Sequence, residues 1–301
     1  MTSTTQLPGT HRETSASVSA QRAVSAGSVL GCQPPGMDPA PGAPAAVLGR
    51  RPAGTLILAH RGCPTPDRPE NTVAAVAAAL AGGADGAEVD VRLTADGTLV
   101  CSHDANLFRL SGRDLSIAGS AARVLRSVPL SGGHILARLD EILQAARHYG
   151  RRRVVVEVKA VSDSGTALRT AGALRKLLAD FPADLDITVS SFDPALLTVV
   201  RGATADLAVA TALLGSSVTP FGALLRRAVE DGYDEVHPNV VSALRDPALV
   251  ATAHSLGIGV TCWTVNERLQ MADLADRGID GMITDDLASA RATLRGLAMP
   301  A

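Results

Sequence analysis

The amino-acid sequence predicts an α/β fold, specifically a closed (β/α)8 (TIM) barrel, and three observations lead to this prediction. From Thr55 onward, short runs rich in Val, Ile and Leu alternate with helical patterns, in eight successive units. Strands that are apolar along their whole length indicate a parallel sheet covered on both faces. Eight such units within about 250 residues suit a closed barrel. A doubly wound open sheet is the alternative, but no G-x-G-x-x-G motif follows the first strand.

The expected strands are short and bounded by polar, Gly-rich or Pro-rich segments. In chain order they span residues 56–59, 86–91, 154–158, 187–190, 207–210, 235–237, 259–263 and 281–283. The helices expected between them have apolar residues at a helical spacing. They span residues 70–80, 165–178, 194–201, 221–230, 246–254 and 267–275, with a last helix that ends near residue 297.

One segment departs from this alternation. After the second strand, Asp96-Gly97 lies between two extended runs, which predicts a β-hairpin. If Leu93 faces Thr98, the returning arm places His103 opposite Glu88. A short insertion with few aromatic residues then leads to the third barrel strand.

Residues 1–52 are rich in Ser, Thr, Ala, Gly, Pro and Gln, without apolar periodicity or the compact apolar segment of a signal peptide. Such a segment cannot bury enough surface to offset the entropy lost on ordering. We therefore expect a disordered tail over 1–52 and one folded domain over 53–301. A start codon assigned too far upstream would explain the same composition.

The bulk composition limits the function classes. The net charge of −2 gives no reason to expect a nucleic-acid or membrane-surface partner, and no apolar run approaches the roughly 20 residues of a membrane span. The four cysteines are far apart in the sequence, which favours reduced thiols and a cytoplasmic location. The oligomeric state is left open.

Three acidic residues are the candidates for a metal site. Glu88 and Asp90 are two residues apart on a strand and so point to one face, and Glu157 with Lys159 repeats this spacing on the next parallel strand. Carboxylates gathered inside a barrel repel one another unless a cation or a proton intervenes. Three carboxylates favour a hard divalent cation, Mg²⁺ or Ca²⁺. The alternative is that each acid pairs with a nearby Arg or Lys, which is the better explanation for any one of them alone.

Two histidines are the candidates for proton transfer. His60 ends the first strand and His103 ends the returning hairpin arm, so both should open onto the carboxyl-end face of the barrel. A lone histidine is more often structural, but two near one acidic group favour acid and base roles. Arg61 and Lys159 supply fixed positive charge for a phosphate. Trp263 is expected to line the pocket wall, with plain barrel packing as the alternative.

Other polar residues have simpler explanations. Asp104 is expected to orient His103 or to cap the next turn. His237 ends the sixth strand and either lines the pocket or makes a structural hydrogen bond. Asn266 is interpreted as a helix cap or a pocket group. The run 151–153 (Arg-Arg-Arg) starts a strand away from the expected site and is interpreted as a solvated patch.

The order of short motifs between residues 55 and 298 resembles the glycerophosphodiester phosphodiesterase family. The motifs are His60-Arg61-Gly62, Pro69-Glu70-Asn71-Thr72, Glu88-Val89-Asp90-Val91, Thr94-Ala95-Asp96-Gly97, His103-Asp104, Glu157-Val158-Lys159, Ser191-Phe192, Trp263-Thr264-Val265-Asn266 and Gly278-Ile279-Asp280-Gly281-Met282-Ile283-Thr284-Asp285.

The resemblance implies a TIM barrel that hydrolyses glycerophosphodiesters to sn-glycerol 3-phosphate and an alcohol. By the family's pattern, the three acids hold a divalent cation, the two histidines act as general acid and base, and Arg61 and Lys159 contact the phosphate. Glu70 would lie near the site. Which of His60 and His103 is the base and which is the acid is left open.

The chain departs from the family's pattern in two places. A proline common after the last strand is replaced in Thr284-Asp285-Asp286-Leu287, and the insertion before Glu157 is short, which leaves the preferred alcohol open. Two alternatives remain. One is a phospholipase-D-like activity on lysophospholipids or sphingomyelin. The other is a barrel that binds a phosphodiester without catalysis, which is disfavoured because every expected catalytic position is occupied.

Overall fold

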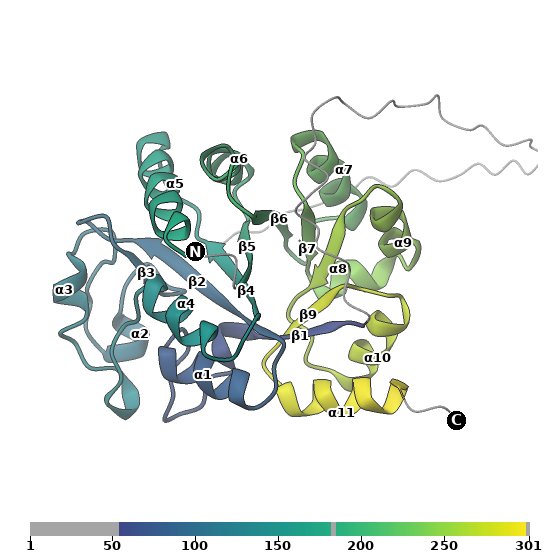
Figure 1. Ribbon diagram of the computed structural model, residues 1–301, viewed down its shortest axis with the longest axis horizontal. Coiled ribbons are helices and arrows are strands. Elements are labelled where there is room, and N and C mark those ends of the chain that lie inside the picture. Colours follow the sequence, from purple (N-terminus) through teal and green to yellow (C-terminus); the bar gives the residue numbers. More distant parts are fainter. Residues whose placement is uncertain (1–53, 182–184, 299–301) are drawn as a thin grey trace, which may run out of the picture. The chain divides into compact units, whose positions relative to one another are not determined.

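The computed structural model describes residues 54–181 and 185–298 (Figure 1). The tail predicted over 1–52 lies outside the described residues, so the domain boundary near residue 53 stays a prediction. Of the helices in the described ranges, none combines the length and the apolar character needed to cross a membrane.

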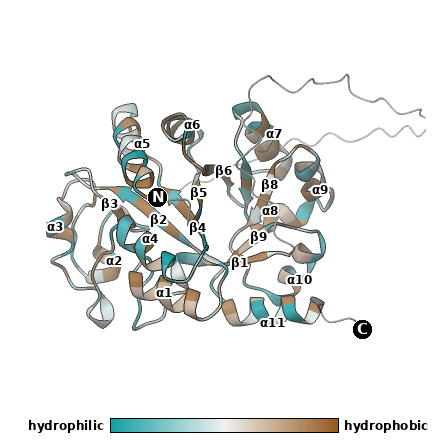
Figure 2. Cartoon of the chain, in the orientation of Figure 1, coloured by the Kyte–Doolittle hydropathy of each residue, from teal (hydrophilic) through white to brown (hydrophobic). Residues whose placement is uncertain are grey.

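Eight parallel strands form a closed barrel, which confirms the predicted fold class. Closure occurs at Leu58, which pairs with Gly86 of the second barrel strand and with Ile283 of the last one. Figure 2 shows the strands largely in the hydrophobic colour and the surrounding helices in mixed colours. The barrel strands are β1 (Leu56–Ala59), β2 (Gly86–Leu93), β4 (Arg153–Val158), β5 (Asp186–Ser191), β6 (Val209–Gly215), β7 (Glu235–Pro238), β8 (Gly259–Cys262) and β9 (Gly281–Thr284).

Several of the helices that follow the strands begin where a polar side chain accepts a backbone N–H, among them the first, fifth, sixth and eighth α-helices. Thr72 accepts from Ala75 N at the start of the first helix, and Asp193 accepts from two backbone N–H groups before the sixth. The helices around the barrel are α1 (Val73–Ala81), α4 (Leu139–Arg147), α5 (Ser164–Ala179), α6 (Pro194–Ala203), α7 (Phe221–Asp231), α8 (Val240–Arg245), α9 (Ala248–Ser255), α10 (Arg268–Asp276) and α11 (Leu287–Ala298).

Three elements around the barrel differ from the sequence prediction, and one of them is α4, which lies in the segment interpreted as an insertion and was not expected as a helix. The strand expected at 207–210 is β6 and begins two residues later, at Val209, and extends to Gly215. The short helix α8 was not expected, because its apolar run directly follows β7 without a separating loop. Its start is fixed by Asn239, whose side chain accepts from Val241 N.

The predicted hairpin forms, but its predicted register is wrong by one residue. β3 (Leu99–Cys101) runs antiparallel to β2 with Leu93 opposite Leu99. The turn contains one residue more than expected, because Thr94 N donates to Thr98 O and Gly97 adopts a positive φ of 78°. His103 is therefore not opposite Glu88.

The insertion after β3 packs around its own small core. It contains α2 (Phe108–Ser111), α3 (Ala122–Leu125) and the 3-10 turn η2 (Ser131–Gly133). Side chains such as Leu107, Ile117 and Leu136 are buried together there. The insertion is thus a structured cap beside the barrel rather than a loose loop.

The barrel interior is apolar at one point and ionic at another. Leu58, Val155 and Ile283 form an apolar cluster. At the amino-terminal end of β4, Arg153 forms an ion pair with Glu235, and its side chain is only 10% exposed. The prediction of a solvated arginine patch is therefore wrong for Arg153, because strand alternation turns it inward on the face of Val155.

Candidate active site

A cavity of about 250 Å³ opens at the carboxyl ends of the strands. Its lining includes each residue that the sequence predicted for the site except Asp90, which lies deeper and is 1% exposed. The lining residues are His60, Arg61, Glu88, His103, Glu157, Lys159, Ser190, Phe192, Leu214, Trp263 and Ile283.

Three carboxylates come together at this cavity. Glu88 and Asp90 extend from β2 and Glu157 from β4, and Asp90 is the register partner of Glu157. One oxygen from each lies within 4.8 Å of the others. Oxygens this close can share a cation with ligand distances of about 2.0–2.6 Å. Glu88 Oε1 is buried and has no hydrogen-bond partner among the described residues, so the donor set fits a hard divalent cation.

The same acids also contact basic groups. Lys159 Nζ lies 2.5 Å from Asp90 Oδ1 and also contacts Glu157 Oε1. Pairing with basic residues, which the sequence left as the alternative, therefore occurs for Asp90 and Glu157. This pairing is compatible with a bound cation, because the three acids outnumber the two positive side chains, Lys159 and Arg61, that contact them.

Burial and neighbouring charges shift the pKa values of Glu88 and Asp90 in opposite directions. Burial, with the charges of Asp90 and Glu157, raises the pKa of Glu88 well above its usual value. Burial acts in the same direction on Asp90, but Lys159 and Arg61 outweigh it and lower the pKa of this carboxyl. Likewise the two carboxylates outweigh burial and raise the pKa of Lys159. Glu88 is thus the acid with most to gain from an added positive charge.

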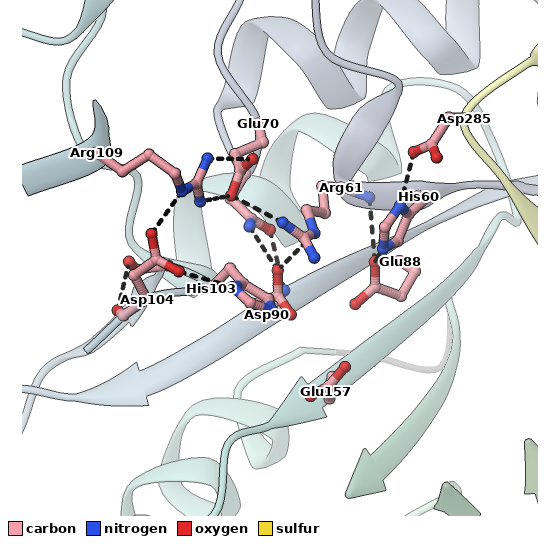
Figure 3. Close-up of polar contacts among 12 residues, drawn as sticks. His60, Arg61, Glu70, Glu88, Asp90, His103, Asp104, Arg109, Glu157 and Asp285 are labelled. Carbon is pink, nitrogen blue, oxygen red and sulfur yellow. Dashed lines mark hydrogen bonds and ion pairs between the residues drawn. The ribbon is translucent and has the colours of Figure 1, made fainter. Parts of the chain in front are cut away.

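His60 is held from the opposite end of the chain. It follows β1 directly in the 3-10 turn η1 (His60–Gly62), and its Nδ1 lies 2.7 Å from Asp285 Oδ1, just after β9. Its Nε2 lies 4.0 Å from Glu88 Oε2 (Figure 3). Asn266 Nδ2 donates to the other oxygen of Asp285 at 2.8 Å. The hydrogen bond to His60 is the main cause that lowers the pKa of Asp285.

His103 is held locally. Its Nδ1 lies 2.8 Å from Asp104 Oδ1, and Arg92 donates to its backbone carbonyl from Nε and Nη2 at 3.1 and 2.8 Å. Burial alone would raise the pKa of Asp104, but His103 and Arg109 outweigh it and lower this pKa. Both imidazoles therefore have Nδ1 on a carboxylate, which leaves Nε2 for other partners.

Arg61 reaches three acids from a strained loop. Its backbone N donates to Glu88 Oε2 at 3.1 Å, its Nη1 donates to Glu70 Oε1 at 3.1 Å, and its Nε lies 3.2 Å from Asp90 Oδ2. Arg61 has a φ of 50°, and Asn71 a φ of 59°. Backbone strain of this kind often occurs at functional sites, where surrounding contacts maintain it.

Sequence reasoning did not assign three residues that organise this site. Asn71 donates from Nδ2 to Asp90 Oδ2 at 2.8 Å and accepts from Asp90 N at 2.9 Å. Asp285 contacts His60, and Arg109 contacts Asp104 and Glu70. Asn71 and Asp285 belong to motif segments and Arg109 does not, but the contacts of all three run across the fold and carry no local spacing signal.

Trp263 forms an apolar wall with Phe192. The two rings meet edge to face with centroids 5.4 Å apart. Trp263 Nε1 donates to His237 O at 2.9 Å, which fixes the indole. His237 itself is fully buried and makes a structural contact with Glu235 at 3.2 Å, so it does not line the cavity.

Comparison with known proteins decides the family. Residues 60–289 match the glycerophosphoryl diester phosphodiesterase family. The chain belongs to this family. It is accordingly a phosphoric diester hydrolase, as the resemblance of its motifs indicated.

Individual relatives of this phosphodiesterase agree. It is 28% identical over 236 residues to a glycerophosphodiester phosphodiesterase of Caldanaerobacter subterraneus, covering 77% of this chain and 94% of that one. It is 32% identical over 230 residues to a Mycobacterium tuberculosis protein named probable glycerophosphodiester phosphodiesterase 1, covering 70% and 82%. A Thermotoga maritima glycerophosphodiester phosphodiesterase has a similar structure, with a TM-score of 0.64, 26% identity and coverage of 80% and 98%.

The fold is also shared with an Oleispira antarctica phosphodiesterase solved in complex with the product sn-glycerol-3-phosphate. The TM-score is 0.71 at 23% identity, and the alignment covers 80% of this chain and 97% of the other.

Proposed function

We propose that the chain hydrolyses glycerophosphodiesters to sn-glycerol 3-phosphate and an alcohol, in the cavity at the carboxyl ends of the strands. The observation that supports this most strongly is the pairing of two imidazoles with carboxylates around one acidic group. Asp285 holds His60 and Asp104 holds His103, each at Nδ1. The Oleispira antarctica phosphodiesterase, solved in complex with sn-glycerol-3-phosphate, supports a product of this kind.

In this proposal Glu88, Asp90 and Glu157 hold a divalent cation, Mg²⁺ or Ca²⁺. Hard oxygen donors and the unpartnered Glu88 oxygen support this assignment. When bound, such a cation supplies positive charge beside a phosphate oxygen and polarises it.

Arg61 and Lys159 bind the phosphate in the proposed mechanism. A phosphodiester is anionic and repels a nucleophilic oxygen, so positive side chains on the cavity wall lower this barrier by neutralising non-bridging oxygens. Both side chains line the cavity and are already fixed by carboxylates. They therefore need little reorganisation when substrate binds.

His60 and His103 move the protons. A carboxylate on Nδ1 favours the tautomer with its proton at that nitrogen and leaves the Nε2 lone pair free to accept one. One ring takes a proton from the attacking water as its oxygen bonds to phosphorus, and the other, in its protonated form, donates a proton to the oxygen of the alcohol as the bond between that oxygen and phosphorus breaks. Trp263 would contact the organic part of the substrate through its ring.

The test is a panel of glycerophosphodiesters, with release of glycerol 3-phosphate as the readout. We expect activity to vanish in EDTA and to return with Mg²⁺ or Ca²⁺. His60→Ala and His103→Ala should each lower kcat by about 100- to 10,000-fold. His148→Ala, at an exposed histidine of the same chain, is the matched control. Full activity in EDTA would contradict the metal assignment, and full activity of either active-site variant would contradict the acid–base roles.

A second substrate class deserves a place in this panel. Phe192 is 40% exposed beside Trp263, so an apolar surface continues from the cavity wall toward solvent. A lysophospholipid could place its acyl chain there, as the phospholipase-D-like alternative requires. Release of choline from lysophosphatidylcholine at a rate above that from glycerophosphocholine would favour this alternative. The cytoplasmic location stays a prediction.

A further inference from the structure

We propose that Arg109 is a positioning residue of the active site, which fixes His103 and Arg61 together through one guanidinium group. Arg109 does not line the cavity, and it belongs to α2 of the insertion. The proposal rests on the proposed function in one respect, namely that His103 transfers a proton.

Arg109 uses all three of its nitrogens. Its Nε donates to Asp104 Oδ2 at 2.6 Å, while Nη1 and Nη2 donate to the two oxygens of Glu70 at 3.0 and 2.6 Å. Figure 3 shows this guanidinium between the two carboxylates. Glu70 and Arg109 are 39 residues apart, so the contacts join the insertion to the loop before α1.

Each of these carboxylates has a second contact on the cavity side. Asp104 Oδ1 meets His103 Nδ1 at 2.8 Å, and Glu70 Oε1 accepts from Arg61 Nη1 at 3.1 Å. The contacts therefore run from the His103 ring through Asp104, Arg109 and Glu70 to Arg61. Removing Arg109 takes one partner from each carboxylate: Asp104 no longer has a second contact that orients the imidazole, and Glu70 is left with Arg61, which Asp90 also holds.

The exposure of Arg109 argues for positioning rather than for a large role in folding. Its side chain is 48% exposed, and exposed ion pairs add little to stability. His103 is itself 40% exposed, so packing alone does not fix its ring. Lysine replaces the contact only in part, because one ammonium group lacks the fork that holds two carboxylates.

The experiment is a double-mutant cycle with glycerophosphocholine as substrate. Arg109→Gln should lower kcat by about 10- to 100-fold through misplacement of His103. It should also raise KM, because Glu70 loses the second partner that fixes its position against Arg61. Arg113→Gln, at an exposed arginine of the same insertion, is the control and should leave both parameters unchanged. Thermal melting of the full chain should change little in either variant.

The cycle separates positioning from general damage. In a His103→Ala background, Arg109→Gln should lose its effect on kcat but keep its effect on KM, whereas in a His60→Ala background both effects should persist. If Arg109→Gln melts early, Arg109→Lys is used, with the same pattern expected and a smaller change. Equal kcat losses in both backgrounds, or none in the wild-type background, overturn the inference. Unchanged activity of His103→Ala alone overturns the proposed acid–base role first, and the inference with it.

Discussion

The buried ion pair inside the barrel makes the sharpest prediction about stability. Glu235 is 2% exposed, and its two oxygens contact Arg153 and His237. Burial by itself raises the pKa of Glu235, but the charge of Arg153, helped by His237, lowers it from 4.5 to about 2. The perturbation is Glu235→Gln, which keeps the shape and removes the charge.

The size of the effect follows from this shift. A fall from 4.5 to about 2 corresponds to about 3 kcal/mol of stability, at about 1.4 kcal/mol per pH unit. Because the folded-state pKa is the lower one, this stability is fully present above pH 4.5 and is lost as the pH falls toward 2. At neutral pH the variant removes the close partner of the buried Arg153 and leaves the 3.8 Å contact to Asp186, and breaking such a buried pair costs about 3–5 kcal/mol.

The assay is urea unfolding at several pH values, followed by circular dichroism. The wild-type chain should lose about 2 kcal/mol more than Glu235→Gln between about pH 5 and about pH 3. Glu230→Gln, at an exposed acid on α7, is the matched control and should keep the wild-type slope. Wild-type stability of Glu235→Gln at neutral pH, or an unchanged slope at acid pH, would refute the reasoning.

Three further predictions concern backbone strain, close packing and the His60 partner. Asn71→Ala removes two hydrogen bonds to Asp90, and the alanine must adopt the positive φ of 59° found at this position, so the free energy of unfolding should fall by about 3–5 kcal/mol. Asn71→Gly, which tolerates this φ, should be about 1 kcal/mol more stable than Asn71→Ala. Equal stability of the two variants would contradict the strain argument. A Cβ at Gly86 would lie 2.1 Å from Arg153 O, so Gly86→Ala should lower the melting temperature clearly, whereas Gly172→Ala, with nothing within 4 Å, should not. Asp285→Asn should lower kcat at least about 10-fold with little change in melting temperature, and an unchanged kcat would argue against a role for this carboxylate.

The alternation of apolar runs with helical patterns along the chain made much of the fold predictable. The apolar runs gave all eight barrel strands, with β6 displaced by two residues. The two-residue period of side chains along a strand also predicted that Glu88 and Asp90 share a face. The hairpin register failed because it depends on how many residues the turn contains, and Thr94 decides this through its contacts with Thr98.

Arg153 shows the limit of local patterns. Three successive arginines indicate a solvated surface, and the first two have no reason to differ from the third in sequence. In the barrel, Arg153 and Glu157 lie four residues apart on β4, so the two-residue alternation of the strand turns both side chains to the same, inward face. The charge of Arg153 is tolerated because β7 supplies Glu235 as an ion-pair partner inside the barrel, with a longer contact to Asp186.

The sequence by itself determined which residues lie near the ends of strands and which of them share a face, since both follow from the local geometry of an extended chain. Only the tertiary structure decided which of them meet. Asp285 contacts His60 across 225 residues because barrel closure places β9 beside β1. Arg109 reaches Glu70 because the insertion folds back over the first loop. Such contacts depend on the closure and packing of the whole chain, and no short stretch of sequence encodes them.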